Sequence, residues 1–342
     1  MSTRLNRFKV IVTFNESKSF QDTLDPDIIS EAAVQDEARA VYSALLERGH
    51  QAEYFPVKNI YEDLPQIRAM KPDVIFNLCE GYLGNARQEM NLAGIWELMD
   101  IPFTGNAPLT LGLAQNKLLA KELFVANGIP TPPYRIYSEI PAGCDLEYPL
   151  IAKPVAEDGS VGITQRSVIH NQSDLEPVIG ALLQKYRQPI LVEKFIPGRE
   201  FNVSVMGNQD PEVLAVGEID YRNVTDDFVK ITSYEAKWLE EHPLYKQTPS
   251  VCPADVDPGL RRRLGALALD VYRCLQGRDY GRVDIRMDED NQLFVLEYNP
   301  NPDISPDAGF VKALRAAGWE YGAFVEFIVQ QAVARKNHES NR

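Results

Sequence analysis

The chain has 342 residues, of which 44% are hydrophobic and 25% are charged, as is typical of a globular protein with two or three domains. Its formal net charge of −14 argues against a nucleic-acid-binding protein that relies on a broad basic surface. The four cysteines and four histidines are scattered, and no apolar run is long enough to span a bilayer. We therefore expect a cytoplasmic protein with no nucleic-acid or membrane partner and no His- or Cys-based metal site.

Strand and helix patterns alternate in the first part of the chain. Apolar runs predict three strands, at 8–14, 52–57 and 73–78. A helix capped by Ser30 and ended by Gly49 would carry its apolar side chains on one face, and a second helix is expected over 89–99. This alternation predicts a parallel α/β sheet. No G-x-G-x-x-G follows the first strand and no G-x-x-x-x-G-K-[ST] occurs, so a nucleotide would have to be bound by another design.

The rest of the chain mixes helices with strand pairs. A helix over 116–127 is followed by a proline-rich connector, which marks a plausible domain boundary. Further strands are expected at 149–154, 189–196, 201–207 and 212–220, and further helices at 173–186, 258–275 and 309–334. The polar segment 223–253 shows weak periodicity and is expected to form loops that cover a site.

The patterns at 281–287 and 293–299 predict a hairpin on which Asp284, Glu297 and Asn299 share one face. If its turn centres on Asp290-Asn291, Asp284 faces Glu297 directly, and if it centres one residue earlier they are diagonal neighbours. A three-residue loop would place them on opposite faces. Two carboxylates and an amide oxygen suit Mg²⁺. The alternative is a solvated acidic hairpin.

A glycine-containing loop at 155–162 lies between two predicted strands, with Lys153 just before it. Gly159 and Gly162 allow close backbone approach and Ser160 adds a donor, so the loop can bind phosphate. A lysine inside an apolar strand needs a partner, and phosphate is a good one. The alternative is a structural hairpin with a lysine that reaches solvent.

Two glutamates lie around the turn after the next strand. Glu193 ends an apolar strand, where an ionised side chain is unusual, and could accept a hydrogen bond from an amine or hydroxyl. The backbone at 194–196 could read the edge of a base. For Glu200, which follows the turn, the alternative is an edge-strand glutamate paired with Lys194 or Arg199.

Seven short segments occur in a fixed order: Asn116-Lys117, Leu150-Ile-Ala-Lys153-Pro, Gly159-Ser160-Val161-Gly162, Leu191-Val-Glu193 through Glu200, Ala236-Lys237-Trp, Gly281-Arg282-Val-Asp284 and Leu296-Glu297-Tyr-Asn299. This order resembles the ATP-grasp enzymes, and among them the D-alanine–D-alanine ligase branch, over roughly 8–334. The resemblance implies an α/β ATP-grasp architecture. An N-terminal parallel α/β substrate domain would span 1–115, and two α+β subdomains at 116–208 and 209–342 would clasp ATP, the second carrying the metal site.

The resemblance also implies residue roles. Lys117 and Lys153 would hold the α- and β-phosphates of ATP, and Lys237 would reach the transferring phosphate from a lid. Mg²⁺, with Mn²⁺ as an alternative, would be held by Asp284, Glu297 and Asn299. Ser160 and the loop through Val161 to Gly162 would cover the phosphates. Glu193 and the backbone of Lys194 and Ile196 would contact the adenine, Glu200 would bind the ribose, and Leu296 would contact the nucleotide. Arg282 would stabilise the oxyanion of the tetrahedral intermediate.

These roles imply an ATP-dependent carboxylate–amine ligase. A substrate carboxylate would attack the γ-phosphoryl group to give an acyl phosphate, and an amine would displace phosphate to form an amide or peptide bond. Arg282, Lys237 and Ser160 are the expected catalytic residues. The expected partners are small carboxylate and amine substrates, with an amino acid or peptide on one side, and the resemblance suggests a homodimer.

The substrate-binding parts depart from the ligase pattern. Glu16 is the only counterpart of a family glutamate after the first strand, and Glu80 stands where those ligases have a histidine. Asp303 and Asp307 replace small polar residues. They would either favour an amine with extra positive charge or several hydroxyl donors, or cap the helix that starts near Ala308. We therefore expect substrates other than D-alanine. The alternatives are an inactive ATP-binding regulatory protein and a true D-alanine–D-alanine ligase.

Overall fold

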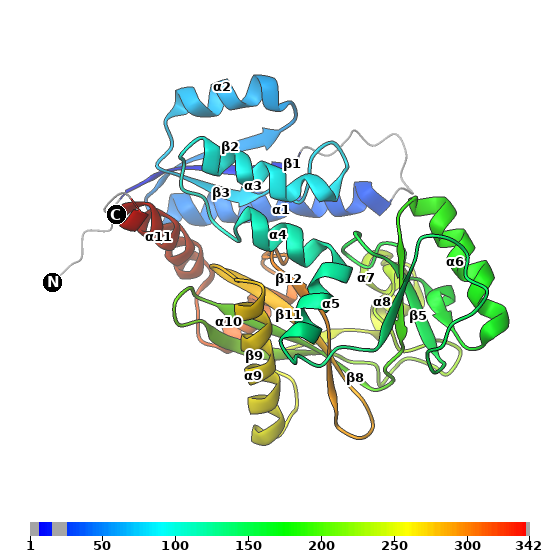
Figure 1. Ribbon diagram of the computed structural model, residues 1–342. Helices are drawn as coiled ribbons and strands as arrows, with labels where there is room; N and C mark the ends of the chain where they lie inside the picture. Colours follow the sequence, from blue (N-terminus) through cyan, green and yellow to red (C-terminus); the bar gives the residue numbers. More distant parts are fainter. Residues whose placement is uncertain (1–6, 16–25, 340–342) are drawn as a thin grey trace.

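Figure 1 shows the computed structural model, which describes residues 7–15 and 26–339. Its strands form a three-stranded, a four-stranded and a five-stranded sheet. The first sheet is parallel, and the strand pairs of the other two are antiparallel. This combination confirms the α/β class expected from the sequence.

The N-terminal part of the chain forms the parallel sheet, in the order β2 (Gln51–Val57), β1 (Lys9–Asn15), β3 (Val74–Leu78). Helices α1 (Pro26–Glu47) and α11 (Tyr321–Glu339) pack on one face, and α2 (Ile60–Met70) and α3 (Glu89–Leu98) pack on the other (Figure 1). Alternate residues of β1 serve these two faces, since Val10 and Val12 join the first core and Ile11 joins the second. The end of the chain therefore packs against its beginning.

The predicted helix start at Ser30 is wrong, because α1 begins at Pro26. Proline is favoured in the first turn of a helix, where its missing N–H is not needed, and Ser30 falls inside the helix. The predicted apolar face is confirmed, since Val34, Ala38 and Val41 are buried in the core.

The middle of the chain begins with α4 (Pro108–Gln115) and α5 (Lys117–Ala126). Asn116 caps α5, and its side chain accepts a hydrogen bond from the backbone N–H of Leu119 at 3.2 Å. The four-stranded sheet follows in the order β4 (Tyr134–Tyr137), β7 (Ile190–Lys194), β5 (Leu150–Pro154), β6 (Val168–Ile169), with α6 (Gln172–Tyr186) packed on it. Because β5 and β7 are neighbours, Lys153 and Glu193 come together.

The five-stranded sheet has the order β10 (Ser250–Val251), β9 (Glu212–Ile219), β8 (Arg199–Met206), β11 (Tyr280–Met287), β12 (Leu293–Asn299). Helices α9 (Pro258–Cys274) and α10 (Gly309–Ala316) both contact this sheet. Strand β8 lies within the predicted central subdomain but is hydrogen-bonded in this C-terminal sheet. The division at residues 115 and 208 remains a prediction.

The segment 223–253 is more regular than expected, because it contains the short helices α7 (Tyr234–Trp238) and α8 (Pro243–Gln247) and strand β10. Single 3₁₀ turns occur at Ala86–Gln88 and Gln165–Ser167. Over residues 7–15 and 26–339, none of the helices is both long and apolar enough to cross a membrane.

One buried carboxylate connects three parts of the fold. Asp279, just before β11, has no exposed surface. It accepts hydrogen bonds from the backbone N–H of Gly105 at 2.9 Å, from Asn208 Nδ2 at 3.1 Å and from Arg335 Nη2 at 3.0 Å. Because Gly105 belongs to the N-terminal part and Arg335 to α11, this carboxylate holds both against the five-stranded sheet.

Candidate active site

The acidic hairpin has the predicted facing pair but reaches it by another route. Met287 lies opposite Leu293 across a turn closed by a hydrogen bond from Asp288 N to Gln292 O at 3.0 Å. That odd-length turn alone would place Asp284 and Glu297 on opposite faces. A bulge at Leu296 shifts the register by one residue, and Asp284 is paired with Glu297.

Asp284 is held by three side chains. Arg282 forms a bidentate ion pair with it, with Nε–Oδ1 at 2.8 Å and Nη2–Oδ2 at 2.9 Å. Asn202 donates to Oδ1 at 2.7 Å and Asn299 donates to Oδ2 at 2.9 Å. Because the Asn299 amide nitrogen faces Asp284, its amide oxygen is directed elsewhere and remains available as a ligand.

Lys117 neutralises the second carboxylate of the hairpin. Its ammonium lies 3.2 Å from Glu297 Oε2, 3.2 Å from Asp158 Oδ1 and 2.6 Å from the backbone oxygen of Glu157. Burial alone would raise the pKa of Glu297, but Lys117 and Lys153 lower that pKa to about 2. Burial opposes the charge of Lys117, yet Glu297 and Asp158 raise its pKa. Both groups are therefore charged at neutral pH.

Glu193 lies between two lysines. Lys153 Nζ is 2.5 Å from Oε1 and Lys121 Nζ is 2.7 Å from Oε2. Lys121 also donates to Thr131 Oγ1 at 2.6 Å. Burial is the main cause that lowers the pKa of Lys121 to about 8. Burial alone would raise the pKa of Glu193, but Lys121 and Lys153 together outweigh it and lower that pKa. The sequence analysis missed Lys121, although its i+4 spacing from Lys117 on α5 could have indicated a second lysine on that face.

The backbone next to Glu193 is partly engaged. The N–H of Lys194 donates to Pro133 O at 2.9 Å, and its ammonium pairs with Glu147 at 2.6 Å. The carbonyl oxygen of Ile196 accepts a hydrogen bond from Arg286 Nη1 at 2.7 Å. The two predicted adenine contacts therefore already have protein partners on these atoms.

The alternative expectation for Glu200, an ion pair with Lys194 or Arg199, is wrong, because those two side chains pair with Glu147 and Glu218. Arg286 faces Glu200 across β11 and β8, with Nη2–Oε2 at 2.9 Å. Tyr221 OH donates to the same oxygen at 2.7 Å, and Thr232 Oγ1 donates to Oε1 at 2.9 Å. Arg286 lies two residues after Asp284 on β11 and therefore on the same face, so the alternating pattern could have indicated Arg286 as a partner for Glu200.

The glycine loop is closed against the segment 223–253. Gly159, Ser160 and Gly162 have positive φ angles of +62°, +64° and +81°. Ser160 Oγ donates to Thr232 O at 2.9 Å, and Trp238 Nε1 donates to Gly159 O at 2.8 Å. A Cβ at Gly162 would lie 2.7 Å from the Pro154 ring, so this close approach requires glycine.

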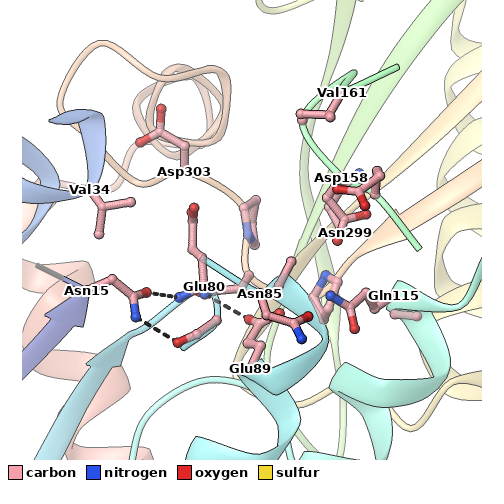
Figure 2. Close-up of a pocket in the computed structure, with 18 of the residues that line it drawn as sticks. Asn15, Val34, Glu80, Asn85, Glu89, Gln115, Asp158, Val161, Asn299 and Asp303 are labelled. Carbon is pink, nitrogen blue, oxygen red and sulfur yellow. Dashed lines mark hydrogen bonds between the residues drawn. The ribbon is translucent and has the colours of Figure 1, made fainter. Parts of the chain in front are cut away.

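A cavity of about 440 Å³ lies beside this loop (Figure 2). Val34 and Asp303 stand on one side of it, and Asp158, Val161 and Asn299 stand on the other (Figure 2). Its lining also includes two predicted catalytic residues, Arg282 and Lys237, and one residue that departs from the ligase pattern, Glu80. The cavity therefore joins the hairpin and the loop to the regions that depart from the ligase pattern.

The two aspartates after the hairpin have different positions. Asp303 lines the cavity, and its Oδ1 accepts a hydrogen bond from Ser305 N at 2.7 Å. Asp307 is exposed and is not part of the lining. The predicted helix cap is wrong for both, because Ala308 is the N-cap residue of α10 and no side chain caps that helix. Glu16 lies outside the described residues.

The comparisons with known proteins agree with this arrangement. A family model described as D-ala D-ala ligase C-terminus matches residues 128–330. The uncharacterized protein y4sG of Sinorhizobium fredii is 33% identical over 307 residues, covering 87% of this chain and 88% of that protein. The D-alanine–D-alanine ligase of Desulforudis audaxviator is 30% identical over 309 residues, covering 87% and 92%.

A solved structure extends the likeness to nearly the whole fold. The crystal structure of D-alanine–D-alanine ligase from Bacillus anthracis, complexed with ATP, matches with a TM-score of 0.75 and 16% identity. The match covers 97% of this chain and 99% of that chain. This likeness confirms the architecture predicted from the sequence.

Proposed function

The chain belongs to the D-alanine–D-alanine ligase family of ATP-dependent ligases with the ATP-grasp fold, and we propose that it joins a small carboxylate to an amine through an acyl phosphate. The observation that carries this proposal is the convergence of the Asp284–Glu297 pair, Lys117 and Arg282 beside the glycine loop and the cavity. Phosphoryl transfer needs positioning and charge neutralisation more than covalent chemistry, and these residues provide both.

Nucleotide binding is assigned to the lysine-rich side of the site. Lys117 and Lys153 would contact the α- and β-phosphates, and the loop from Ser160 through Val161 to Gly162 would cover them. Glu193 would accept the adenine amine, with backbone at Lys194 and Ile196 and the side chain of Leu296 nearby. The two lysines at Glu193 support this assignment, because together they leave one positive charge there for an anion.

The ribose is assigned to Glu200. Its carboxylate already accepts hydrogen bonds from Tyr221 and Thr232, and both hydroxyls come from the lid side of the site. Ribose hydroxyls would therefore replace or share these donors, and the lid would respond to the nucleotide.

The donor set fits Mg²⁺, and Mn²⁺ is an alternative. Asp284 and Glu297 face each other directly and Asn299 offers an amide oxygen, which are the oxygen ligands that Mg²⁺ prefers. Asp284 is paired with Arg282, and Glu297 is paired with Lys117. A divalent ion bound between the two carboxylates would share them with these side chains. When bound, the ion would supply charge neutralisation between the phosphates.

The bond changes are those of carboxylate activation. A substrate carboxylate oxygen forms a bond to the γ-phosphorus while the bond to the β-phosphate oxygen breaks, which gives an acyl phosphate and ADP. The amine nitrogen then attacks the acyl carbon, loses a proton, and phosphate leaves. Arg282 would stabilise the oxyanion of that step, while Lys237 and Ser160 would steady the transferring phosphate.

We propose substrates other than two D-alanines, because the residues at Glu80 and Asp303 differ from the ligase pattern and both line the cavity. The test is ADP release in the presence of a panel of carboxylates and amines that includes D-alanine, with product masses measured. Product from D-alanine alone would identify a D-alanine–D-alanine ligase instead. ATP binding without turnover on any pair would favour the regulatory alternative.

A further inference from the structure

We propose, on the basis of the ligase function above, that the cavity selects a substrate with a cationic nitrogen group that does not react. Glu80 and Asp303 would bind this ammonium or guanidinium group at the end of the cavity opposite the glycine loop, with Glu89 also in the cavity lining. Lysine, ornithine, arginine and diamines have the required chemistry.

The cavity is polarised along its length. Asp303 and Glu80 stand toward α1 and β1, whereas Asp158 and Asn299 stand toward the glycine loop (Figure 2). Five acidic residues and three basic residues line it: Glu80, Glu89, Glu157, Asp158 and Asp303 against Lys58, Lys237 and Arg282. Asp158 is already paired with Lys117, so the lining acids that a ligand cation could serve are Glu80, Glu89 and Asp303.

Glu89 is a buried carboxylate that lacks a cation. Its side chain is on the first residue of α3 and has a relative exposure of 7%. Asn301 Nδ2 donates to its Oε1 at 3.1 Å, and no other hydrogen bond or ion pair reaches this carboxylate within residues 7–15 and 26–339. Burial, followed by the charges of Asp158 and Glu80, raises the pKa of Glu89 well above its usual range, and a ligand cation beside this carboxyl group would favour its ionised form.

Glu80 is held in place by its backbone rather than by its carboxylate. Asn15 accepts a hydrogen bond from Glu80 N at 2.7 Å and donates one to Gly81 O at 2.7 Å (Figure 2). Gly81 has a φ of +156°, and a Cβ there would lie 2.7 Å from the backbone oxygen of Asn85. This brace fixes the loop, while the carboxylate forms no hydrogen bond or ion pair with any residue in the described part of the chain.

A metal ion does not fit these acids. Among the residues described, no group of three or more His, Cys, Asp or Glu side chains is placed to hold one. Separated acids suit an organic cation, whose several N–H donors can reach different carboxylates. A cavity of about 440 Å³ accommodates a molecule of amino-acid or dipeptide size.

A further carboxyl group lies behind the cavity wall. Glu37, on α1, is buried and accepts a hydrogen bond from the backbone N–H of Ile304 at 2.8 Å, next to Asp303. Burial, followed by the charges of Asp303 and Glu80, raises the pKa of Glu37 well above its usual range, which favours its neutral form. A cation bound at Asp303 and Glu80 would oppose that shift.

The experiment compares substrates that differ only in the cationic group. ADP release would be measured with L- and D-lysine against the norleucines, and with cadaverine against pentylamine, each supplied as carboxylate or amine as its groups allow. We expect kcat/KM to be at least about tenfold higher for the charged member, because the neutral member leaves the carboxyl groups of the cavity without a cation. Glu80→Gln, Glu89→Gln and Asp303→Asn should each reduce this ratio.

The matched control is Asp307→Asn, which removes the same charge from the same loop outside the cavity lining and should leave the ratio unchanged. Equal kcat/KM for charged and neutral members would overturn the proposal and leave the ligase function standing. If no pair releases ADP, calorimetry with lysine and norleucine on protein loaded with Mg²⁺ and a non-hydrolysable ATP analogue decides separately. Tighter binding of lysine, weakened by Asp303→Asn, would support the proposal, and equal binding would refute it.

Discussion

Asp284 and Glu297 face each other on β11 and β12 because two register shifts cancel. The odd-length turn moves Glu297 to the wrong face, and the bulge at Leu296 returns it. The facing of the two proposed metal ligands therefore results from the turn and the bulge together.

Replacing either acid should abolish turnover and preserve the fold. Glu297→Gln and Asp284→Asn should each lower kcat about 100-fold or more, the scale for removing one charged group that stabilises a transition state. Mn²⁺ binding in the presence of the ATP analogue, measured by electron paramagnetic resonance, should weaken in parallel. Glu289→Gln, an exposed change in the turn of the same hairpin, is the control. Near-normal turnover of either variant in saturating Mg²⁺ would remove these residues from the metal site.

Deletion of Leu296 should remove the bulge and preserve the facing pair. Without Leu296, Glu297 follows Val295 directly and takes the position opposite Asp284. The single deletion should therefore retain turnover, whereas deletion of Val295 and Leu296 together places Glu297 opposite Ile285, on the other face, and should abolish turnover. Loss of turnover in a single-deletion variant that folds by circular dichroism would show that the bulge itself is required.

Loss of Glu193 should destabilise the protein more than loss of Lys121. Glu193→Gln leaves the buried Lys121 and Lys153 without a carboxylate, and breaking a buried pair in this way costs roughly 3 kcal/mol. Lys121→Met leaves Glu193 paired with Lys153 and should cost less. The combined variant Lys121→Met/Glu193→Gln removes one of the two like charges and should recover part of the loss seen in Glu193→Gln. Urea unfolding measures all three, and a Lys121→Met variant less stable than Glu193→Gln would contradict this order.

The acidic end of the cavity predicts a pH-dependent stability. Burial, followed by the charge of Asp303, raises the pKa of Glu80 to about 7 from its usual 4.5. The folded protein then binds more protons than the unfolded chain between these values, so stability decreases as pH rises from about 4.5 to about 7. Glu80→Gln removes this decrease. Because the Glu80 side chain remains exposed to solvent, which screens its interactions, the variant should melt only ~2 °C above wild type at pH 8, with no difference at pH 5. Equal differences at both pH values would contradict the assignment.

The contact between the glycine loop and α7 predicts a lid that reports nucleotide binding. Trp238→Phe removes the hydrogen bond to Gly159 O, and hydrogen exchange should become faster across 159–162 and 233–238. Mg²⁺ and the ATP analogue should slow exchange there in wild type more than in the variant. Unchanged protection in both proteins would rule out closure.

The hairpin and its facing acids could be predicted because period-two alternation is a local pattern. The bulge could not, since Leu296 is an apolar residue in an apolar strand and nothing local distinguishes it. Two partners of Glu200 could not be predicted for a different reason, because Thr232 lies in the weakly periodic segment 223–253 and Tyr221 lies just before it. Their approach to β8 is set by tertiary packing alone.

The buried Asp279 has a consequence for which molecules can be accepted. It fixes the N-terminal part of the chain, which carries Glu80 and Glu89, relative to β11, where Arg282 follows three residues later. The two ends of the cavity are thus held a set distance apart, and the cavity would select substrates by their length. In a homologous series of diamines or basic amino acids, one chain length would span it best, with each added or missing methylene weakening the fit by about 1–3 kcal/mol.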